Sequence, residues 1–195
     1  MRSGAPPNRQ ALESAKSHDR RVREGWYEKY CPASRNGIDI GCSSDPIHDH
    51  FDQWDMAFGD GDAVFMDGIP NNSYHTVYTS HLLEHVWDPI KAIQRWFEIL
   101  APGGNMIICV PHRDLYEKRL VLPSRFNGDH KTFWLPNRYE PPCTFSLSGT
   151  IMDALLGRPY ELLSLTVLNE GWTPLPPEVH SPGEYAIEAI VAKFT

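Results

Sequence analysis

The fold of this chain is decided by the stretch Asn36-Gly37-Ile38-Asp39-Ile40-Gly41-Cys42-Ser43-Ser44-Asp45. Two β-branched isoleucines on either side of Asp39 predict a short buried strand that ends at Gly41. In α/β sheets, ligands bind outside the carboxyl ends of the strands, where a glycine lets backbone N–H groups approach them closely. We therefore interpret this stretch as the first strand of an α/β sheet and its ligand-binding loop, although an ordinary strand-to-turn junction shows the same pattern.

Length and composition are those of one folded domain. The 195 residues are 41% hydrophobic and 22% charged. The four cysteines lie far apart without a Cys-x-x-Cys pair, so we expect reduced thiols rather than a disulfide framework or a zinc knuckle. No apolar run reaches membrane-spanning length, and the first residues lack the apolar core of a secretory signal. We therefore expect a cytoplasmic protein with no membrane partner.

Charge is distributed unevenly along the chain. The formal net charge is −7, but residues 1–36 hold eight Lys/Arg against four Asp/Glu, so this segment carries +4 and the remainder −11. An acidic body argues against a nucleic-acid partner, because such binding depends on neutralising phosphates. We interpret Arg20, Arg21 and Arg23 as the solvated face of an N-terminal helix.

The first half of the chain predicts short elements. Residues 1–9 are expected to be disordered, and residues 10–30 to form a helix whose apolar face includes Val22 and Trp26. Only thirteen positions separate Asp39 from Asp52. A complete strand–helix–strand unit needs about thirty residues, so the first crossover is predicted to lack a full helix. Further strands are expected at 50–55, 64–66 and 76–79.

The second half shows clearer periodicity. Apolar residues at 90, 93, 97 and 100 predict a helix that Asp88-Pro89 starts and Pro102-Gly103-Gly104 stops. The continuous apolar run 106–110 predicts a strand buried on both faces. Residues 112–144 show no period and are interpreted as a functional irregular segment. A helix that begins near residue 146 or 148 and two extended segments, 161–168 and 185–194, follow.

Several motifs in this order resemble the class I S-adenosylmethionine-dependent methyltransferases, in particular the small single-domain enzymes of sugar and polysaccharide pathways. Five stretches carry the resemblance: Ile38–Cys42 (the cofactor-binding motif), Gly61–Ala63 with Met66 (the adenine-contacting motif), Tyr74–Val77 (a family strand start), Ser80–Val86 with Asp88-Pro89 (the "LEH-x-x-DP" signature) and Leu100–Gly104 (the "L-x-PGG" turn).

The resemblance implies a Rossmann-like α/β fold. Its sheet would have seven mostly parallel strands with an antiparallel last strand, flanked by helices, and an abbreviated first crossover helix. Residues 1–195 would form one methyltransferase-like domain. Its parts would be an N-terminal helical cap (1–36), a cofactor-binding half (37–110), a substrate loop or lid (111–145), and a C-terminal helix and strand pair (146–195).

The resemblance also implies S-adenosyl-L-methionine as the cofactor and S-adenosyl-L-homocysteine as the product. The backbone at Gly41, Cys42 and Ser43 would face the amino-acid tail of the donor. Asp39 would bond to the loop backbone or, through water, to the ammonium group of the tail. Ser80 or His81 would lie beneath the methionine portion.

The remaining donor contacts would come from acids. By resemblance, an acid at the end of the second strand binds both ribose hydroxyls, as in dinucleotide folds. Asp52 is the first candidate for this contact, and Asp55 is the second because the strand register is open. Asp62, followed by Ala63, would accept from the adenine amino group.

Two residues depart from the family pattern. Ser43 and Asp45 stand where the family usually has glycine, and a carboxylate at 45 could repel the carboxylate of the donor. These departures motivate an alternative hypothesis, in which the chain is a degenerate, non-catalytic member of the fold that serves as a binding module or partner subunit.

Methyl transfer needs alignment of nucleophile, methyl carbon and sulfur, and a hydroxyl acceptor also needs a base. His112, Asp114 and His130 are the predicted base candidates, although each could equally be a solvated loop residue. We expect a small-molecule acceptor that is sugar-containing or anionic. The sequence does not decide whether an oxygen or a nitrogen atom of the acceptor is methylated. A homodimer is compatible with the sequence. The cations that could hold an anionic group of the acceptor are Arg113, Lys118, Arg119, Arg125 and Lys131. The aromatic residues Tyr116, Phe126, Phe133 and Trp134 could wall the acceptor or could equally form a small core of their own within residues 112–144.

No metal site is predicted. The stretch His81-Leu82-Leu83-Glu84-His85 fits the H-x-x-E-H pattern of a zinc peptidase class. That chemistry needs a sustained helix and a third ligand downstream, whereas Pro89 begins a new helix four residues later. The stretch 48–52 has two histidines without a further partner at familiar spacing, and we interpret it as a polar turn.

Overall fold

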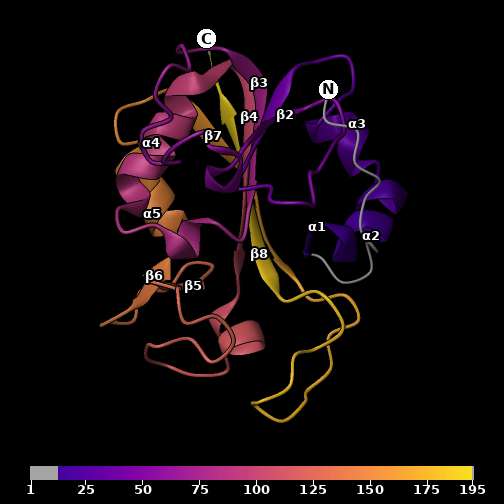
Figure 1. The fold of residues 1–195 in the computed structure, drawn as a ribbon, viewed down its shortest axis with the longest axis vertical. Helices are drawn as coiled ribbons and strands as arrows, with labels where there is room; N and C mark the ends of the chain where they lie inside the picture. Colours follow the sequence, from indigo (N-terminus) through magenta and orange to yellow (C-terminus); the bar gives the residue numbers. More distant parts are fainter. Residues whose placement is uncertain (1–12, 195) are drawn as a thin grey trace.

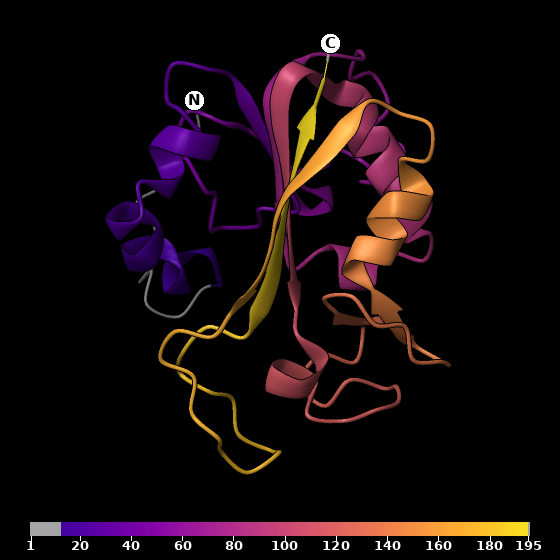
Figure 2. The same ribbon diagram turned by 180° about the vertical axis from the view of Figure 1, so that it is seen from behind.

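The computed structural model describes residues 13–194. The predicted disordered tip and the start of the predicted N-terminal helix lie outside these residues. A central sheet is covered by α4 and α5 on one face, here called the apolar face, and by α1, α2 and α3 on the other, here called the N-terminal face (Figures 1 and 2). The helices are α1 (Glu13–Lys16), α2 (His18–Arg23), α3 (Trp26–Tyr30), α4 (Pro89–Ile99) and α5 (Leu147–Ala154).

The sheet has the strand order β2-β1-β3-β4-β8-β7. Its strands are β1 (Gly37–Ile40), β2 (Asp52–Trp54), β3 (Tyr74–Ser80), β4 (Leu100–Pro111), β7 (Tyr160–Leu168) and β8 (Ala186–Lys193). The first four pair in parallel, and β8 is antiparallel to both of its neighbours. The α/β architecture with an antiparallel last strand is confirmed, and no helix lies between β1 and β2.

The described residues contribute six strands to this sheet, not seven. The predicted strand at 64–66 is a turn, because its backbone bonds locally to Asp62. The Asp62 side chain accepts from the Val64 N–H (2.7 Å), and its carbonyl accepts from the N–H groups of Phe65 and Met66. No N–H group of this segment is then left to pair with β2.

The helices of the apolar face begin as predicted. The Asp88 carboxylate accepts from the Lys91 N–H (3.0 Å) at the start of α4, and the Ser146 hydroxyl accepts from the Gly149 N–H (3.0 Å) at the start of α5. Each cap satisfies a backbone donor that has no partner within its helix. These local contacts explain why the sequence alone places both helices.

The apolar face is filled by aliphatic and aromatic side chains. Side chains alternate along each strand, so Ile38 and Ile40 face α4 while Asp39 faces the other side. Ile93 and Trp96 of α4 are completely buried in the same cluster. The main core of the protein therefore lies between α4, α5 and the sheet.

The N-terminal face differs from the prediction. The expected single helix is three short ones, interrupted at Ser17 and at Gly25, where φ is +63°. Arg20 and Arg21 are buried, whereas Val22 is 57% exposed. The interpretation of these arginines as a solvated helix face is wrong, because carboxylates far away in the sequence lie opposite them.

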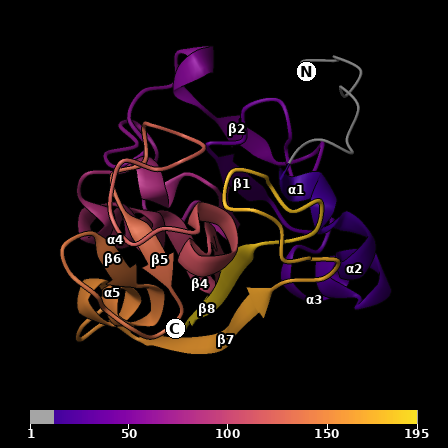
Figure 3. The ribbon, with the colours of Figure 1, turned by 90° about the horizontal axis from the view of Figure 1, so that it is seen from below.

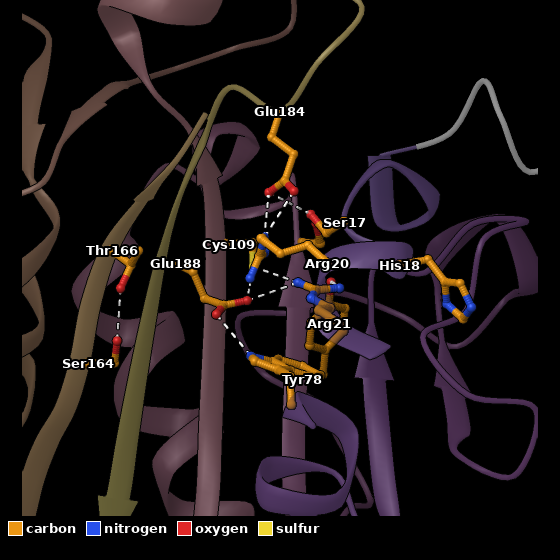
Figure 4. A network of polar contacts seen from close by, with 12 residues as sticks. Ser17, His18, Arg20, Arg21, Tyr78, Cys109, Ser164, Thr166, Glu184 and Glu188 are labelled. Carbon is orange, nitrogen blue, oxygen red and sulfur yellow. Dashed lines mark hydrogen bonds and ion pairs between the residues drawn. The ribbon is translucent and has the colours of Figure 1, made fainter. Parts of the chain in front are cut away.

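Each of these arginines forms an ion pair with a glutamate (Figure 4). Arg21 donates to the Glu188 carboxylate (2.9 Å) and to the Tyr78 hydroxyl (3.1 Å), and the indole N–H of Trp26 donates to the other Glu188 oxygen (3.0 Å). Arg20 donates through Nε to both oxygens of Glu184 (3.0 and 3.2 Å). This hydrogen-bonded network attaches the N-terminal helices to β3, β4 and β8.

Residues 112–144, here called the lid, follow β4 at the carboxyl end of the parallel strands. Figure 3 shows this segment and the loop between β7 and β8 from below. The lid contains a π-helical turn (Arg113–Glu117) and a parallel pair of short strands, β5 (Phe133–Leu135) and β6 (Thr144–Ser146), which extends just beyond it. No helix among residues 13–194 combines the length and apolarity that crossing a membrane requires.

Candidate cofactor and acceptor site

The loop after β1 depends on Gly41. Its φ is +77°, its N–H donates to the Trp54 carbonyl (2.8 Å), and a Cβ there would lie 2.9 Å from the Leu82 side chain. Ser43 also adopts a left-handed backbone, with φ +49°. Ser43, which stands where the resemblance expects a glycine, thus adopts the left-handed region that glycine enters most readily.

Two cavities meet at Gly41. The large cavity has a volume of about 510 Å³ and the small cavity about 190 Å³. Residues that line the large cavity include Gly41, Trp54, Asp55, Asp62, Ala63, Phe65, Leu82, His85, Val86, Lys91 and Asp129. The small cavity is lined by Glu13, Ser14, Asp39, Gly41, Cys42, Ser43, Ser44, Asp45, Ser80 and His81.

The two candidates for the ribose contact occupy different places. Asp52 begins β2 and accepts a hydrogen bond from the Tyr74 hydroxyl (2.8 Å), outside the lining of both cavities. Asp55 directly follows β2 and lines the large cavity. Its two oxygens accept from the N–H groups of Ser43 (2.9 Å) and Ala57 (2.8 Å), and each keeps a lone pair for a further donor.

Asp62 and Ala63 also line the large cavity. One oxygen of Asp62 holds the turn at Val64, and the other has room to accept a further hydrogen bond. Trp54 and Leu82 provide apolar surface in the same cavity. This combination suits a flat heterocycle with an exocyclic amine.

Asp39 and Asp45 both line the small cavity, and their side chains accept hydrogen bonds from backbone N–H groups. Asp39 accepts from the Ile47 N–H (2.7 Å), and its burial raises the pKa of the carboxyl to about 7. Asp45 accepts from the N–H groups of Ser14 (2.9 Å) and Ala15 (3.3 Å). The residue that departs from the family pattern thus connects the loop to α1.

His81 is among the residues that line the small cavity. Its φ is +53°, in the left-handed region that few non-glycine residues adopt, and its Nδ1 lies 2.9 Å from the Ser80 hydroxyl. The other nitrogen is 3.9 Å from the Glu13 carboxylate of α1. Burial lowers the pKa of His81 to about 4, so its ring is neutral at neutral pH.

The three base candidates are not brought together. His112 caps the π-helical turn: its Nδ1 accepts from the Asp114 N–H (3.1 Å), which occupies the lone pair that a base would use. The carboxylate of Asp114 pairs with Arg113 (2.8 Å) and is half exposed. His130 is buried, with its Nδ1 2.5 Å from the Glu117 carboxylate. It adjoins Asp129, which lines the large cavity.

Most of the cations that were predicted to hold the acceptor form ion pairs or hydrogen bonds with other groups of the chain. Arg113 pairs with Glu140 as well as Asp114, Lys118 donates to backbone carbonyls of the β7–β8 loop, and Lys131 pairs with Asp129 (2.6 Å). Phe133 and Trp134 are buried in the body of the protein rather than lining either cavity. Lys91 is the cation that lines the large cavity.

Residues 16–140 match the family model of the methyltransferase domain. This chain belongs to the methyltransferase-domain family. It is an S-adenosylmethionine-dependent methyltransferase of class I, and S-adenosylmethionine is its cofactor. None of the curated proteins matches the chain significantly.

Solved structures share the fold of this methyltransferase at low sequence identity. A SAM-dependent methyltransferase from Aquifex aeolicus is 11% identical over 97% of this chain and 98% of that chain, with a TM-score of 0.51. The [4+2]-cyclase SpnF is 13% identical over 93% and 82%, with a TM-score of 0.56. A protein whose structure is described under the conversion of a disulfide bond into a thioacetal group during echinomycin biosynthesis is 16% identical. The match covers 88% of this chain and 80% of that chain, with a TM-score of 0.57.

The residues of this methyltransferase fit its cofactor. Carboxylates at positions 55 and 62 match donors such as ribose hydroxyls and an exocyclic amine, and Gly41, which lines both cavities, places no side chain there. When bound, the cofactor supplies an activated methyl group, so the chain itself must bind, align and exclude water.

Proposed function

We propose that this methyltransferase transfers a methyl group to a hydroxyl of a small neutral acceptor, such as a sugar or a sugar-containing metabolite. The observation that carries the proposal is the pair of cavities that meet at Gly41. In this proposal the small cavity takes the amino-acid tail of the donor, and the large cavity takes the adenosine and opens toward the acceptor.

The residue roles follow from placement. We assign the ribose contact to Asp55, because Asp55 lines the large cavity and Asp52 does not. The adenine contact is assigned to Asp62 and Ala63. The tail is assigned to the loop Gly41–Ser43, with Asp39 nearby to balance the ammonium group.

The charge of the large cavity favours a neutral acceptor over an anionic one. Its lining contains four aspartates, Asp55, Asp62, Asp88 and Asp129, against the single cation Lys91. Such a lining raises the local concentration of cations and lowers that of anions.

A calorimetric titration with S-adenosylhomocysteine tests the donor assignment. We expect micromolar binding to the native protein and binding at least tenfold weaker in Asp62→Ala. Asp67→Ala is the matched control, because Asp67 is an exposed aspartate of the next loop that lines neither cavity. Equal affinity in Asp62→Ala and Asp67→Ala would remove the adenine assignment. No binding to the folded native protein would favour the non-catalytic alternative.

Incubation with S-adenosylmethionine and matched acceptor pairs tests the acceptor class. We expect methylation of a neutral sugar, detected by mass spectrometry, and much slower methylation of the corresponding sugar phosphate. Faster transfer to the phosphate would contradict the argument from cavity charge.

A further inference from the structure

Three side chains with metal-ligating atoms converge where the 3-10 turn Leu83–His85 meets the lid. A carboxylate oxygen of Glu84 and one ring nitrogen each of His85 and His130 lie within 4.8 Å of one another. The Nε2 atoms of both histidines are 3.9 Å from the same oxygen, Oε1 of Glu84. One ion placed between them would contact all three atoms once the side chains close around it.

Glu84 is the unusual member of this cluster. Its side chain is fully buried, and neither carboxylate oxygen has a hydrogen-bond partner among residues 13–194. Burying a carboxylate without a partner is costly, and native proteins nearly always pair such groups or use them to coordinate a metal. The Glu84 carboxylate therefore lacks a partner, and the two imidazole nitrogens beside it suggest a shared metal ion as that partner.

The Nδ1 atom of each histidine, on the side of the ring away from Glu84, is already hydrogen-bonded to another carboxylate. His130 Nδ1 lies 2.5 Å from a Glu117 oxygen, and the other Glu117 oxygen accepts from the Ser124 hydroxyl (2.5 Å). His85 Nδ1 lies 3.0 Å from the Asp129 carboxylate. A carboxylate accepts hydrogen bonds, so each Nδ1 carries the hydrogen and each Nε2 presents a lone pair toward Glu84. Carboxylates behind histidine ligands orient the rings in this way in metal sites.

The backbone holds the cluster together across a long sequence separation. The carbonyl of Glu84 accepts from the N–H groups of Lys131 (2.7 Å) and Thr132 (3.3 Å). These bonds fix the lid segment that carries His130 against the turn that carries Glu84 and His85. The cluster is therefore held by backbone as well as by side chains.

We propose that Glu84, His85 and His130 form a binding site for a divalent first-row transition metal such as Zn²⁺. Two imidazole nitrogens and one carboxylate oxygen suit these ions, whereas Mg²⁺ and Ca²⁺ prefer oxygen ligands. Ligand bonds of about 2.0–2.1 Å place tetrahedral ligand atoms about 3.3 Å apart. The two 3.9 Å separations therefore need about 0.6 Å of closure, and a pair at the 4.8 Å limit of the cluster would need about 1.5 Å.

The site borders the large cavity, because His85 and Asp129 belong to its lining. Three protein ligands leave a coordination position for a small molecule. If the proposed methyl transfer to a hydroxyl is correct, the metal would bind the acceptor oxygen there and lower the pKa of the hydroxyl. The binding of the metal itself does not depend on that function.

Titration of chelator-treated, full-length protein with Zn²⁺ by calorimetry, and with Co²⁺ by visible absorption, tests the proposal. We expect one ion per chain and an absorption band of Co²⁺ in a low-symmetry site. Affinity should fall at least tenfold in Glu84→Gln and in His130→Ala. Glu117→Gln, which removes only the orienting charge behind His130, should weaken binding by about tenfold. His50→Ala is the matched control, because His50 is an exposed histidine beside His48.

Absence of one-to-one binding of both ions overturns the proposal. Binding that survives Glu84→Gln but is lost in His50→Ala also overturns it, because the ion would then lie at the 48–50 turn. If Glu84→Gln fails to fold by circular dichroism, His85→Gln replaces it, since the His85 side chain is 24% exposed. S-adenosylhomocysteine affinity, measured in parallel, separates the two proposals: donor binding without metal binding removes only the metal site, and the reverse removes only the proposed function.

Discussion

The apolar face and the N-terminal face of the sheet are both covered by helices, but the side chains between helix and sheet differ in kind. On the apolar face, α4 contributes Ile93 and Trp96 to a cluster of buried aliphatic and aromatic side chains. On the N-terminal face, the buried pair Arg21 and Glu188 lies at the centre, surrounded by Tyr78, Trp26 and Cys109.

The difference shows that the two faces tolerate change differently. When a side chain in a packed hydrocarbon cluster is shortened, the free energy of unfolding falls in proportion to the volume of the cavity that is left. A buried ion pair is worth little against a well-packed apolar replacement, but removing one partner leaves the other charge buried and unpaired. Four predictions separate these cases, and they are given from the largest expected effect to the smallest.

Glu188→Ala should lower the free energy of unfolding by about 3–5 kcal/mol, because Arg21 and the Trp26 indole lose a buried acceptor together. Urea unfolding at pH 7 measures the change. The double variant Arg21→Met/Glu188→Leu removes both charges and should recover most of the loss. A double variant as unstable as Glu188→Ala would mean that the pair itself, rather than the unpaired charge, determines stability.

Ile93→Val should cost about 0.5–1.5 kcal/mol, since one buried methylene is lost from the apolar face. Thermal and urea unfolding give the value. Val22→Ala on the N-terminal face is the control, because Val22 is exposed and should change stability by no more than about 0.5 kcal/mol. A larger loss for Val22→Ala than for Ile93→Val would contradict the structure of the N-terminal helices.

Asp39→Asn should change the pH dependence of stability. The pKa of Asp39 is raised to about 7 by burial, so between pH 4 and 7 the folded chain holds a proton that the unfolded chain releases. The native protein should therefore lose stability relative to Asp39→Asn as the pH rises through this window, with no further change above it. A flat stability difference between the two proteins at pH 4, 5.5, 7 and 8 would show that Asp39 is ionised in the folded chain throughout this range.

Arg23→Gln should have the smallest effect. Arg23 pairs with Glu170 at 2.6 Å, but both side chains are more than half exposed, and such pairs contribute about 0–1 kcal/mol. The loss should shrink further in high salt. A cost comparable to that of Glu188→Ala would mean that burial is not what distinguishes the two ion pairs.

The accuracy of the sequence-based predictions follows the same division. The helix α4 was predictable, because its cap at Asp88, its proline and its apolar period all lie within four residues of the atoms they affect. The arginines at 20 and 21 were misinterpreted, because their partners Glu184 and Glu188 are more than 160 positions away. A basic run looks the same whether it faces water or a buried carboxylate.

The candidate site shows the same limit. Gly41 and the two candidate acids at β2 could be recognised from the sequence, but the strand register decided that Asp55 rather than Asp52 lines the cavity. His130 could be named as a base candidate, yet only the fold places it beside Glu84 and His85. The H-x-x-E-H pattern suggested His81 as a ligand, and the structure directs His81 to Glu13 instead.

The sequence by itself determined the strand at Gly37–Ile40, the glycine turn, the capped helices and the order of motifs that marks a methyltransferase. Backbone propensity, capping and close approach depend on neighbours within a few residues, so the sequence contains them directly. Tertiary structure alone decided which charges are buried, which acids line the cavities and which side chains converge at Glu84. Those outcomes depend on partners brought together by strand register and by the lid, and no local pattern records the distance between them.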